Sequence, residues 1–534
     1  MSINFLQNGS DIRGTALGTN KSQPANFGPL EAFYIFFGFC TLLKEKKNIR
    51  EPLTIAVGRD PRLSGPALVH AVSAAARLKN INLINGGISS TPAMFMATKF
   101  PEIKADGSIM ITASHLPSNR NGMKFFTAQG GLDKEDIFFI LEESSKAAAK
   151  FPPEKASALM DPAVFDKHSK THFGYGCSIL KKESNSKETA LSLLMKLYTT
   201  HLREMVIKGL EGSKEPLKDM KIIVDAGNGA GGFFVSEIFK PLGADTSGSL
   251  FLNPDGNFPN HEPNPENKEA MEIFSKAVKR EKADLGLIFD TDVDRSAAVT
   301  SQGRPLARNA IVALAAALIS EKYPGTTVVT DSITSCELKT FLEKDLDLKH
   351  LRFKRGYKNV INKSIELNSK GIDSQLAIET SGHGAYKENY FLDDGAYLAV
   401  KILIAATKLK KKGKGIEELI SGLKEPSEAF EFRFPIKSSH FRDMGKAILN
   451  ETEAWVKEKE ESGTAIHLET PNYEGVRINF EAEEGNGWCL LRASLHDPLL
   501  VLNIESNSPG GGLLISETLK NFLKKFEELD ISKL

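Results

Sequence analysis

Apolar and polar positions alternate along most of the chain in a way that predicts strands separated by helices. Short apolar runs at 53–57 and 109–111 each end in a polar turn, as strands do. Apolar residues with helical spacing occupy 64–78, and the dipeptide Gly86-Gly87 indicates a turn after the next strand. Strands that alternate with helices predict layered α/β domains.

The pattern changes near position 429. Apolar runs at 430–436, 476–480 and 488–492 are typical of antiparallel strands, and long helical stretches flank them. A smaller α+β domain is therefore predicted at the C-terminal end.

A chain of 534 residues is too long for one hydrophobic core. The breaks in the pattern predict four domains. Their boundaries are 1–204, 205–307, 308–428 and 429–534. Within the first domain, residues 146–187 are polar and irregular, which indicates an insertion.

Charge narrows the range of partners. Lys plus Arg equals Asp plus Glu at 68 each, so the chain has no overall basic field for nucleic acid, and any anion site must be local. The stretch 30–43 is apolar but short and contains Glu31, which favours a buried helix over a membrane span. With no apolar leader at the N-terminus, we expect a cytoplasmic protein that does not contact membranes.

Cysteine usage agrees with a reducing compartment. Cys40, Cys177, Cys336 and Cys489 lie far apart without CxxC spacing. This pattern speaks against a zinc site and against a disulfide framework.

The stretch 109–126 carries the first candidate chemistry. An apolar run leads into a polar turn that holds Ser114 and His115, and Lys124 follows on the next run. A loop tip on a rigid strand is a favourable place for a catalytic group, so Ser114 is a candidate nucleophile or phosphoryl acceptor. A Ser-His pair that only satisfies the loop backbone is the alternative. Arg13, in a polar loop near the N-terminus, is a candidate cation for the same site.

Asp290, Asp292 and Asp294 follow an apolar run at alternate positions, with Arg295 next. Three such carboxylates cannot all stay ionised at close range without a cation, and hard oxygen ligands suit Mg²⁺. An EF-hand does not fit, because its glycine and final glutamate positions would hold Arg295 and Ser301. A solvated acidic turn is the other reading.

Two more polar clusters can bind a sugar phosphate. Arg492, Ser494 and His496 lie on one tight turn between apolar runs, and they suit a phosphate. A structural pair between Arg492 and Asp497 is the alternative there. The second of these clusters offers donors and acceptors for sugar hydroxyls. It consists of Glu379, Ser381 and His383.

Gly227, Gly229 and Gly232 satisfy a GxGxxG pattern, and Asp245 lies near the distance expected of a ribose-binding acid. Such glycines also permit a tight strand-to-helix turn, and we favour that reading over dinucleotide binding. Taken together, the other clusters supply a hydroxyl, a cation site, cationic side chains and a phosphate cradle. That set is typical of phosphoryl transfer.

The ordered motifs resemble those of the α-D-phosphohexomutase superfamily over nearly the whole chain. Residues 112–117 resemble its TASHNP-type phosphoserine loop, and 290–295 resemble its DGDGDR metal loop. Residues 379–383 are similar to its ExSGH sugar loop, and 492–498 are similar to its phosphate loop.

The resemblance implies four domains around a central active-site cleft, three of them α/β with mixed sheets. It implies a phosphorylated Ser114 and Mg²⁺ held by that group and the three aspartates. A hexose 1,6-bisphosphate would form as the intermediate and would also serve as activator. The implied substrates are hexose 1- and 6-phosphates of mannose or glucose, and the enzyme would be a monomer or a homodimer. The residues implied for catalysis and charge neutralisation are Ser114, His115, Arg13, Lys124 and Arg295, and those for substrate binding are Tyr357, Glu379, Ser381, His383, Arg492, Ser494 and His496.

Several positions depart from the family pattern. Leu116 replaces an asparagine, Thr291 and Val293 replace glycines of the metal loop, and Tyr357 stands where many mannose or glucose enzymes have histidine. Residues 495–497 also differ from the usual phosphate loop. The altered phosphate loop leaves open a family member that binds sugar phosphates without catalysis. Phosphoglucosamine mutase also stays an alternative, because residues 122–126 resemble its loop too. A phosphatase of the DxD type fits less well, because its first aspartate would be the nucleophile.

Overall fold

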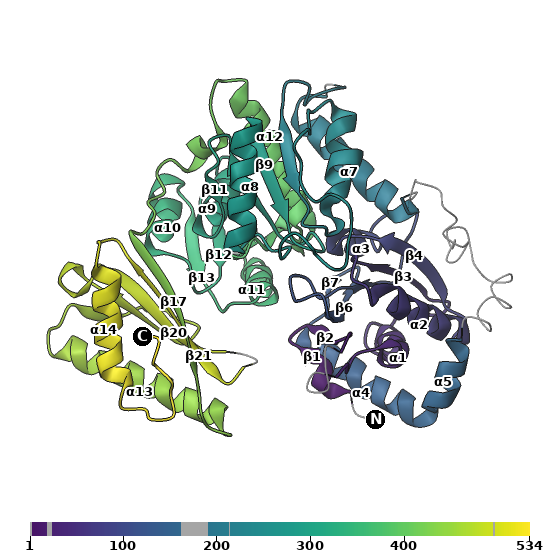
Figure 1. Ribbon diagram of the computed structural model, residues 1–534, viewed down its shortest axis with the longest axis horizontal. Coiled ribbons are helices and arrows are strands. Elements are labelled where there is room, and N and C mark those ends of the chain that lie inside the picture. The colour runs from purple at the N-terminus through teal and green to yellow at the C-terminus, as the bar shows by residue number, and fades with distance from the viewer. Residues whose placement is uncertain (1–2, 19–23, 162–190, 213, 495–496) are drawn as a thin grey trace. The chain divides into compact units, whose positions relative to one another are not determined.

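The computed structural model describes residues 3–18, 24–161, 191–212, 214–494 and 497–534 (Figure 1). The chain divides into two compact units. Unit 1 consists of Met1–Ala307 and Ser381–Glu418, and unit 2 consists of Arg308–Thr380 and Leu419–Leu534.

The first sheet of unit 1 is mixed. Its strand order is β1-β2-β6-β5-β3-β4, and the short β7 pairs with β6. β3 is parallel to β4 and β5, whereas β6 is antiparallel to β5 and β2. The strands are β1 (Gln7–Asn8), β2 (Asp11–Thr15), β3 (Thr54–Arg59), β4 (Asn82–Ile88), β5 (Gly107–Ile111), β6 (Arg120–Thr127) and β7 (Gly130–Gly131).

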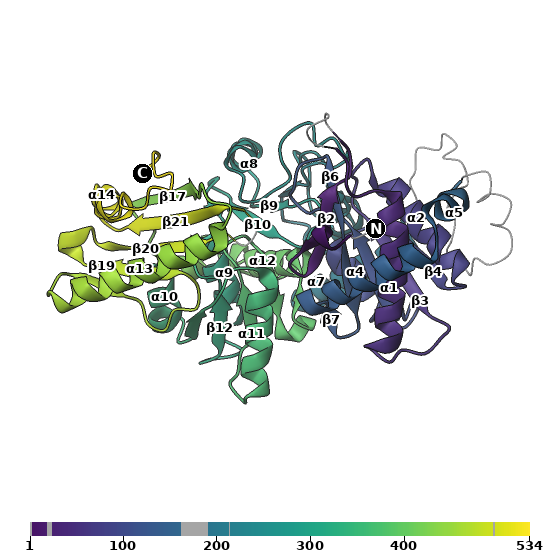
Figure 2. The same ribbon diagram turned by 90° about the horizontal axis from the view of Figure 1, so that it is seen from below.

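Helix α1 (Pro29–Glu45) lies at the centre of the helical layer beside this sheet and packs against α2 (Gly65–Leu78) and α4 (Lys134–Lys150) (Figure 2). Its start is fixed by proline at the first position and by the Glu31 carboxylate, which accepts a 2.8 Å hydrogen bond from the Gly28 amide. Residues 32–40 are all buried, so the prediction of a buried helix at 30–43 is confirmed. Two shorter helices, α3 (Thr91–Met96) and α5 (Pro153–Leu159), complete this part.

The second sheet of unit 1 has the order β11-β10-β9-β8 and delivers the acidic loop. β8 is parallel to β9, and β10 is antiparallel to β9 and β11. Helix α8 (Lys268–Glu281) covers it with apolar residues at positions 270, 271, 274, 277 and 278, the spacing of an amphipathic helix. The strands are β8 (Ile222–Asp225), β9 (Leu285–Phe289), β10 (Ser296–Thr300) and β11 (Pro305–Leu306).

The returning segment of unit 1 forms a hairpin and a long helix. β15 (Gly384–Tyr386) pairs antiparallel with β16 (Leu392–Asp393), and α12 (Gly395–Lys410) follows. α12 packs against β10 and against α7 (Leu193–Gly209). Between β8 and α8 the chain forms short helical turns. These are η2 (Ala230–Gly232), η3 (Phe234–Phe239) and η4 (Lys240–Leu242).

Unit 2 contains a parallel set of strands in which β12 (Thr327–Thr330) pairs with β13 (Lys349–Arg352) and β14 (Leu376–Ile378). Helix α11 (Tyr357–Ser369) packs on β12 and β14, and α9 (Asn309–Ser320) also contacts β14. Two further turns are α10 (Cys336–Thr340) and η5 (Phe341–Asp345).

The C-terminal part of unit 2 is a fully antiparallel sheet with the order β17-β21-β20-β19-β18 (Figure 1). Helices α13 (Phe441–Glu461) and α14 (Gly511–Leu523) pack against it and share one core with it, for example through Ile448, Ile478 and Ile515. The strands are β17 (Glu428–Pro435), β18 (Ile466–Leu468), β19 (Val476–Phe480), β20 (Gly487–Ala493) and β21 (Leu499–Ser506).

The predicted fold class is confirmed: α/β domains with mixed sheets precede a smaller domain with an antiparallel sheet. Two local predictions were wrong. The region 146–187 is not irregular throughout, because α4 runs to Lys150 and α5 follows, while 162–187 lies outside the described residues. Gly86 and Gly87 lie inside edge strand β4, where the register shifts opposite Val57 and Gly58; the glycines permit a bulge there. The four domain boundaries stay predictions.

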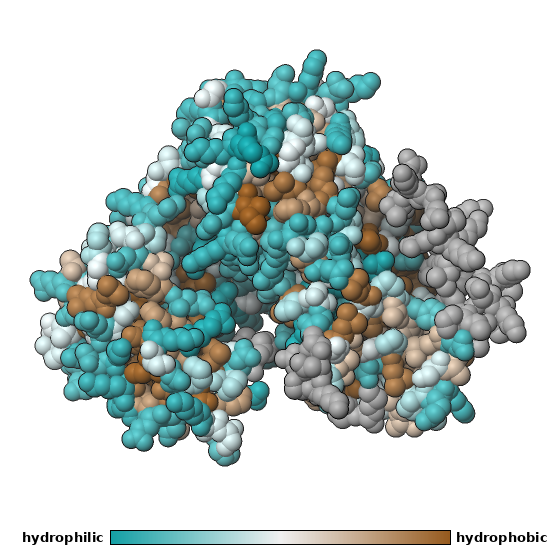
Figure 3. All heavy atoms as spheres, viewed as in Figure 1, coloured by the Kyte–Doolittle hydropathy of each residue, from teal (hydrophilic) through white to brown (hydrophobic). Residues whose placement is uncertain are grey.

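Hydrophilic residues cover most of the face drawn in Figure 3, and the hydrophobic residues visible there form separate groups. In the described part of the chain, no helix combines the length and apolar character needed to cross a membrane. The described cysteines, Cys40, Cys336 and Cys489, are free thiols.

Candidate active site

Ser114 follows strand β5 in a tight, largely buried loop of unit 1. Its φ of 50° lies in the left-handed region, which non-glycine residues adopt at a cost and mostly at functional sites. The Ser114 amide donates a 2.9 Å hydrogen bond to the Thr112 hydroxyl, and this bond holds the turn. The turn directs the Ser114 hydroxyl toward the acidic loop after β9.

Arg62, a residue that sequence reasoning missed, holds this loop from beneath. Its fully buried guanidinium donates to the carbonyls of Ser114 and Leu116 at 2.5 Å and to that of Pro117 at 2.6 Å. Asp60 accepts from Arg62 Nε at 3.1 Å and neutralises the buried charge. In the sequence, an arginine and an aspartate (residues 59 and 60) directly follow the apolar run at 53–57. This polar turn was the available sign that the segment 58–62 supports a site.

The Ser114 Oγ lies within reach of two groups from the acidic loop. It donates to Asp290 Oδ2 at 2.9 Å and accepts from Arg295 Nη2 at 3.3 Å. His115 Nδ1 lies 3.4 Å from the same Oγ. The structure thus brings the predicted hydroxyl and the predicted metal loop together within unit 1.

The acidic loop connects β9 and β10, and each of its three carboxylates is buried. Ligand oxygens of Asp290, Asp292 and Asp294 lie within 4.8 Å of one another, a grouping that can hold a metal ion. Val293, which stands where the family pattern has glycine, has a φ of 64°. A β-branched residue is strained in this conformation, so the surrounding contacts must impose it.

The glycines of the GxGxxG segment pack against this loop. A side chain at position 229 would lie 2.8 Å from the Thr291 carbonyl, and the Ala230 amide donates to that carbonyl at 2.8 Å. Asp245 lies apart from this turn, with an exposed side chain that accepts from the Ser247 amide at 2.9 Å. The contacts agree with the tight-turn reading.

Cations partly neutralise the three carboxylates. Lys124 Nζ pairs with Asp294 Oδ2 and lies 3.3 Å from Asp292 Oδ2, while Arg295 Nη2 pairs with Asp290 at 3.1 Å. Burial and the charge of Asp294 raise the pKa of Asp290 to about 8. Burial acts on Asp294 in the same sense, but Lys124, His383 and Arg295 outweigh it and lower the pKa of Asp294 well below its usual range.

Two carboxylate oxygens of the cluster indicate a metal site. Asp292 Oδ1 and Asp294 Oδ1 are buried and have no hydrogen-bond partner in the described part of the chain. Buried carboxylate oxygens are costly when unsatisfied, and oxygen ligands of this kind suit a hard divalent cation. The residues therefore fit a metal ion.

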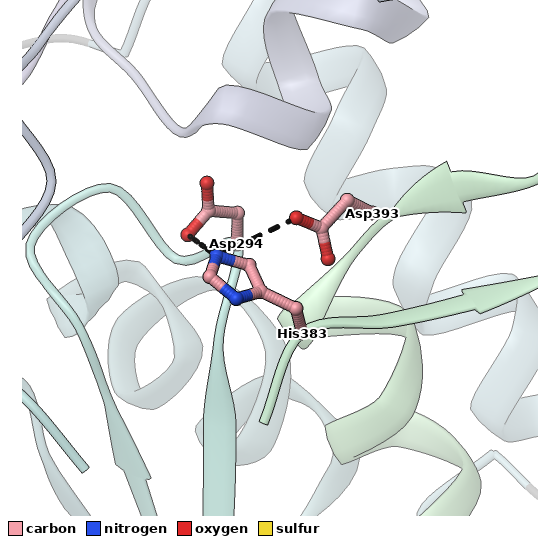
Figure 4. A group of neighbouring side chains, drawn as sticks. All are labelled: Asp294, His383 and Asp393. Carbon is pink, nitrogen blue, oxygen red and sulfur yellow. Dashed lines mark ion pairs between the residues drawn. The ribbon is translucent and has the colours of Figure 1, made fainter. Parts of the chain in front are cut away.

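His383 lies beside the metal loop rather than apart from it (Figure 4). Its Nε2 lies 3.7 Å from Asp294 Oδ1 and 3.6 Å from Asp393 Oδ2, and its Nδ1 lies 2.9 Å from the Ser381 hydroxyl. Gly382 has a φ of 92°, and a side chain there would lie 2.7 Å from the Ser296 carbonyl. Only glycine lets this segment approach the loop so closely. Asp393 was not foreseen from the sequence.

Arg13 and His115 complete the groups of unit 1. Arg13 is buried on β2, where it pairs with Asp11 at 2.8 Å and donates to the Thr112 carbonyl at the base of the Ser114 loop. The positive charge of Arg295, together with burial, lowers the pKa of His115 to about 2, so its ring is neutral near pH 7.

Unit 2 contains four other predicted substrate groups. Glu379 Oε1 accepts from the Gly356 amide at 2.7 Å, immediately before Tyr357 at the start of α11. Arg492 lies near the end of β20 and is largely buried, and the Ser494 hydroxyl accepts from the Asp497 amide at 3.2 Å. His496 lies outside the described residues.

The fold and the motifs place the chain among the phosphosugar mutases, and comparisons with known proteins agree. Residues 6–150, 196–303 and 307–425 match domains I, II and III of the family described as phosphoglucomutase/phosphomannomutase, each an alpha/beta/alpha domain. The chain belongs to this family, within the α-D-phosphohexomutase superfamily, whose members are phosphotransferase mutases.

Individual relatives are similar over most of their length. A phosphomannomutase/phosphoglucomutase of Pseudomonas putida is 28% identical over 475 residues, which cover 89% of this chain and 88% of the relative. A phosphoglucomutase of Neisseria gonorrhoeae is 29% identical over 502 residues, 93% of this chain and 92% of the relative. The crystal structure of a phosphoglucomutase/phosphomannomutase family protein from Burkholderia thailandensis has the same fold, with a TM-score of 0.71, 23% identity and coverage of 99% and 98%.

Proposed function

We propose that this chain is a phosphohexomutase that interconverts hexose 1-phosphate and hexose 6-phosphate of mannose, glucose or both. The observation that carries the proposal is the 2.9 Å contact between the Ser114 Oγ and Asp290, inside a cluster of three buried carboxylates. A hydroxyl beside a divalent-cation site is the arrangement that phosphoryl transfer requires. The family membership agrees with this activity.

In the proposed resting state, Ser114 carries a phosphoryl group. Mg²⁺ held by Asp290, Asp292, Asp294 and a phosphoseryl oxygen would act as a Lewis acid when bound. The hexose hydroxyl oxygen attacks the phosphorus, the bond from phosphorus to Ser114 Oγ breaks, and the hydroxyl gives up its proton. Arg295 Nη2 lies 3.3 Å from Oγ, where it can stabilise the charge that develops on the leaving oxygen.

The hexose 1,6-bisphosphate then turns and returns its other phosphoryl group to Ser114. Arg13 keeps the base of the Ser114 loop in place, and Lys124 neutralises charge beside Asp292 and Asp294. The proton acceptor is one of the neighbouring groups. His115 and Lys124 are candidates because they lie near Ser114 in the sequence, and the position of His383 beside Asp294 adds a third.

Unit 2 supplies most of the groups proposed to bind the substrate. Arg492 and Ser494, with His496, would hold the phosphate already on the hexose. The residues proposed to contact the sugar hydroxyls are Tyr357, Glu379, Ser381 and His383.

The test is phosphorylation of Ser114, measured by intact-protein mass after incubation with glucose 1,6-bisphosphate. The parent chain should gain one phosphate, Ser114→Ala should gain none, and the neighbouring Ser118→Ala should behave as the parent does. Mutase activity should be lost in parallel by at least about 10³-fold in Ser114→Ala. A parent chain that gains no phosphate and has no activity would support a sugar-phosphate-binding protein instead.

Substrate preference needs a second assay. Coupled assays on mannose, glucose and glucosamine 1-phosphates separate the favoured activity from phosphoglucosamine mutase, which the sequence left as an alternative. Activity on the glucosamine compound alone would overturn the preference proposed here. The cytoplasmic location and the choice between monomer and homodimer stay predictions.

A further inference from the structure

Two arginines of unit 2 lie on segments that contact the same short stretch of chain, and only one of them was foreseen. Arg355 lies in the loop between β13 and α11, and Arg492 lies near the end of β20. The Arg355 amide donates to Glu474 Oε2 at 3.1 Å. The next residue, Gly475, lies directly against Arg492: a side chain at 475 would come within 2.8 Å of the Arg492 Cβ. The segment 474–475 therefore joins the two arginine-bearing segments.

This junction is fixed rather than incidental. The same Glu474 Oε2 also accepts a hydrogen bond from the Ser332 hydroxyl, so one carboxylate oxygen ties two loops of the parallel-strand region to the antiparallel sheet. Gly475 has a φ of 58°. A Cβ atom added at this position would lie 2.2 Å from the Leu491 carbonyl oxygen. No side chain fits there, so the close approach to Arg492 depends on glycine.

One buried N–H group at this junction is unsatisfied. Arg492 is nine-tenths buried, and its Nε has no hydrogen-bond partner in the part of the chain that the structure describes. Burial and the nearby charge of Arg355 lower the pKa of Arg492, and the charges of Glu474, Glu431 and Asp331 oppose this shift without cancelling it. Burying a guanidinium with an unsatisfied N–H beside a like charge is unfavourable unless an anion completes the site.

Arg355 lies beside the acidic residue Asp331 and is partly exposed. Its Nε lies 3.7 Å from Asp331 Oδ2, longer than a hydrogen bond, and its side chain is 27% exposed. Asp331 is buried beside Glu379, and burial and that like charge raise its pKa to about 7. Because the Arg355 side chain is partly exposed, its guanidinium can reach a ligand from solvent.

We propose that Arg355 joins Arg492 as a second guanidinium ligand for the phosphate carried by the hexose. The ligand class is a phosphate monoester dianion, for which paired arginine N–H groups are well suited. Glu474 is then a positioning residue that holds the Arg355 loop beside Arg492. This inference rests on the proposed function for its choice of substrate, but it specifies a residue that the resemblance did not supply.

The test measures binding to the full-length chain by calorimetry, with inorganic phosphate and glucose 6-phosphate as probes. Arg355→Ala should weaken both by about 10- to 100-fold, the effect of losing hydrogen bonds from a charged group. Arg355→Lys should retain part of the affinity, because it keeps the charge but loses the planar fork. The control is Arg442→Ala, an exposed arginine of α13 in the same unit, and its affinities should equal those of the parent.

Kinetics separate a binding role from a structural one. Arg355→Ala should raise KM for the hexose phosphate with a smaller change in kcat, and the extent of Ser114 phosphorylation should stay as in the parent. Glu474→Gln keeps both arginines but weakens the loop anchor, so it should raise KM by about 3- to 10-fold. If Arg355 only stabilises the fold through Asp331, its removal will lower the melting temperature and leave both affinities unchanged, and the proposal is wrong.

The outcomes also separate this inference from the proposed function. Arg355-dependent phosphate binding without Ser114 phosphorylation or mutase activity would contradict the mutase proposal and leave the two-arginine site standing. Mutase activity in the parent, with unaltered phosphate affinity and KM in Arg355→Ala, would do the reverse. Failure of the parent chain to bind either phosphate would overturn the two-arginine site.

Discussion

Two regions of the molecule bury charged side chains of opposite sign. One is the acidic loop of unit 1, and the other is the part of unit 2 where the segment 474–475 contacts the segments that carry Arg355 and Arg492. Around Asp290, Asp292 and Asp294, buried negative charge exceeds what Lys124 and Arg295 neutralise, and two carboxylate oxygens have no hydrogen-bond partner in the described part of the chain. Around Arg355 and Arg492 the carboxylates of Glu474, Glu431 and Asp331 lie near the two arginines, but the buried Arg492 Nε still has no hydrogen-bond partner in the described part of the chain. Each region leaves buried polar atoms that its proposed ligand can satisfy, a divalent cation in one case and a phosphate in the other.

Such incomplete sites reduce stability in the absence of ligand. Unpaired buried charge is unfavourable, and unit 1 adds backbone strain at Ser114 and Val293. Ligand binding relieves the imbalance, so each ligand should stabilise its own unit. Substitutions that neutralise the excess charge should abolish function while leaving the ligand-free fold intact or more stable.

The largest effect is expected for Asp292→Asn. Removing one negative charge from the cation site should lower kcat by about 10²- to 10³-fold. Without metal, its free energy of unfolding should equal or exceed that of the parent, because one like charge is gone. The increase in melting temperature that Mg²⁺ gives the parent should disappear. Thermal melts with and without Mg²⁺ check this, with the exposed Asp219→Asn as control. An equal increase in both proteins would contradict the assignment of this loop to the metal.

Lys124→Met is the reverse of the previous change, because it removes a positive charge from the acidic loop instead of a negative one. Lys124 is 4% exposed and lies between Asp292 and Asp294, so its loss leaves two buried carboxylates uncompensated. We expect the metal-free protein to lose about 3 kcal/mol of unfolding free energy. Added Mg²⁺ should restore much of that loss, because it supplies positive charge at the same place. Urea unfolding at two Mg²⁺ concentrations measures both values, and a loss that Mg²⁺ does not reduce would mean that Lys124 acts only through packing.

Arg492→Gln is the matching change in unit 2. We expect kcat/KM for the hexose phosphate to fall by about 100-fold, mainly through KM, because a charged phosphate ligand is lost. The ligand-free protein should melt at the same temperature or higher, since Arg355 no longer faces a like charge. Steady-state kinetics and thermal melts check the two parts. A strongly lowered melting temperature would show that Arg492 is a structural partner of the fold, and the parallel between the two regions would fail.

Sequence reasoning found the elements whose signal is local. The strand-like runs at 53–57 and 109–111 and the buried helix near 30–43 follow from the pattern of apolar residues, and they correspond to β3, β5 and α1 of the structure. The three aspartates and Ser114 were recognised from motifs, and the fold brings them together in unit 1.

What the sequence did not reveal depends on contacts between distant segments. Arg62 is separated from Pro117 by more than 50 positions, so the polar turn at 58–62 could not reveal that this side chain binds four carbonyls of the Ser114 loop. Asp393 and Arg355 were also missed, because an isolated acid or base in a loop is usually a surface charge. Their partners, His383 and Glu474, are fixed only by tertiary packing.

The smallest effect is expected at Glu505, a buried carboxyl group that belongs to neither site. Trp488 Nε1 donates to Glu505 Oε2 at 3.1 Å. Burial, with a smaller contribution from Glu337, raises its pKa to about 7 against the opposing charges of Arg308 and Arg477.

The raised pKa means that the folded state binds the Glu505 proton more tightly than the unfolded state does. The associated stability is present at acidic pH and is lost as the pH rises through the folded pKa. Glu505→Gln keeps an acceptor for Trp488 but cannot ionise, so it should not show this loss. Between about pH 5 and pH 6.5 the stability of the variant relative to the parent should increase by about 1–2 kcal/mol. Urea unfolding across that range measures the difference. A difference that is independent of pH would mean that Glu505 stays ionised in the folded protein. Arg308 and Arg477 would then compensate its charge fully.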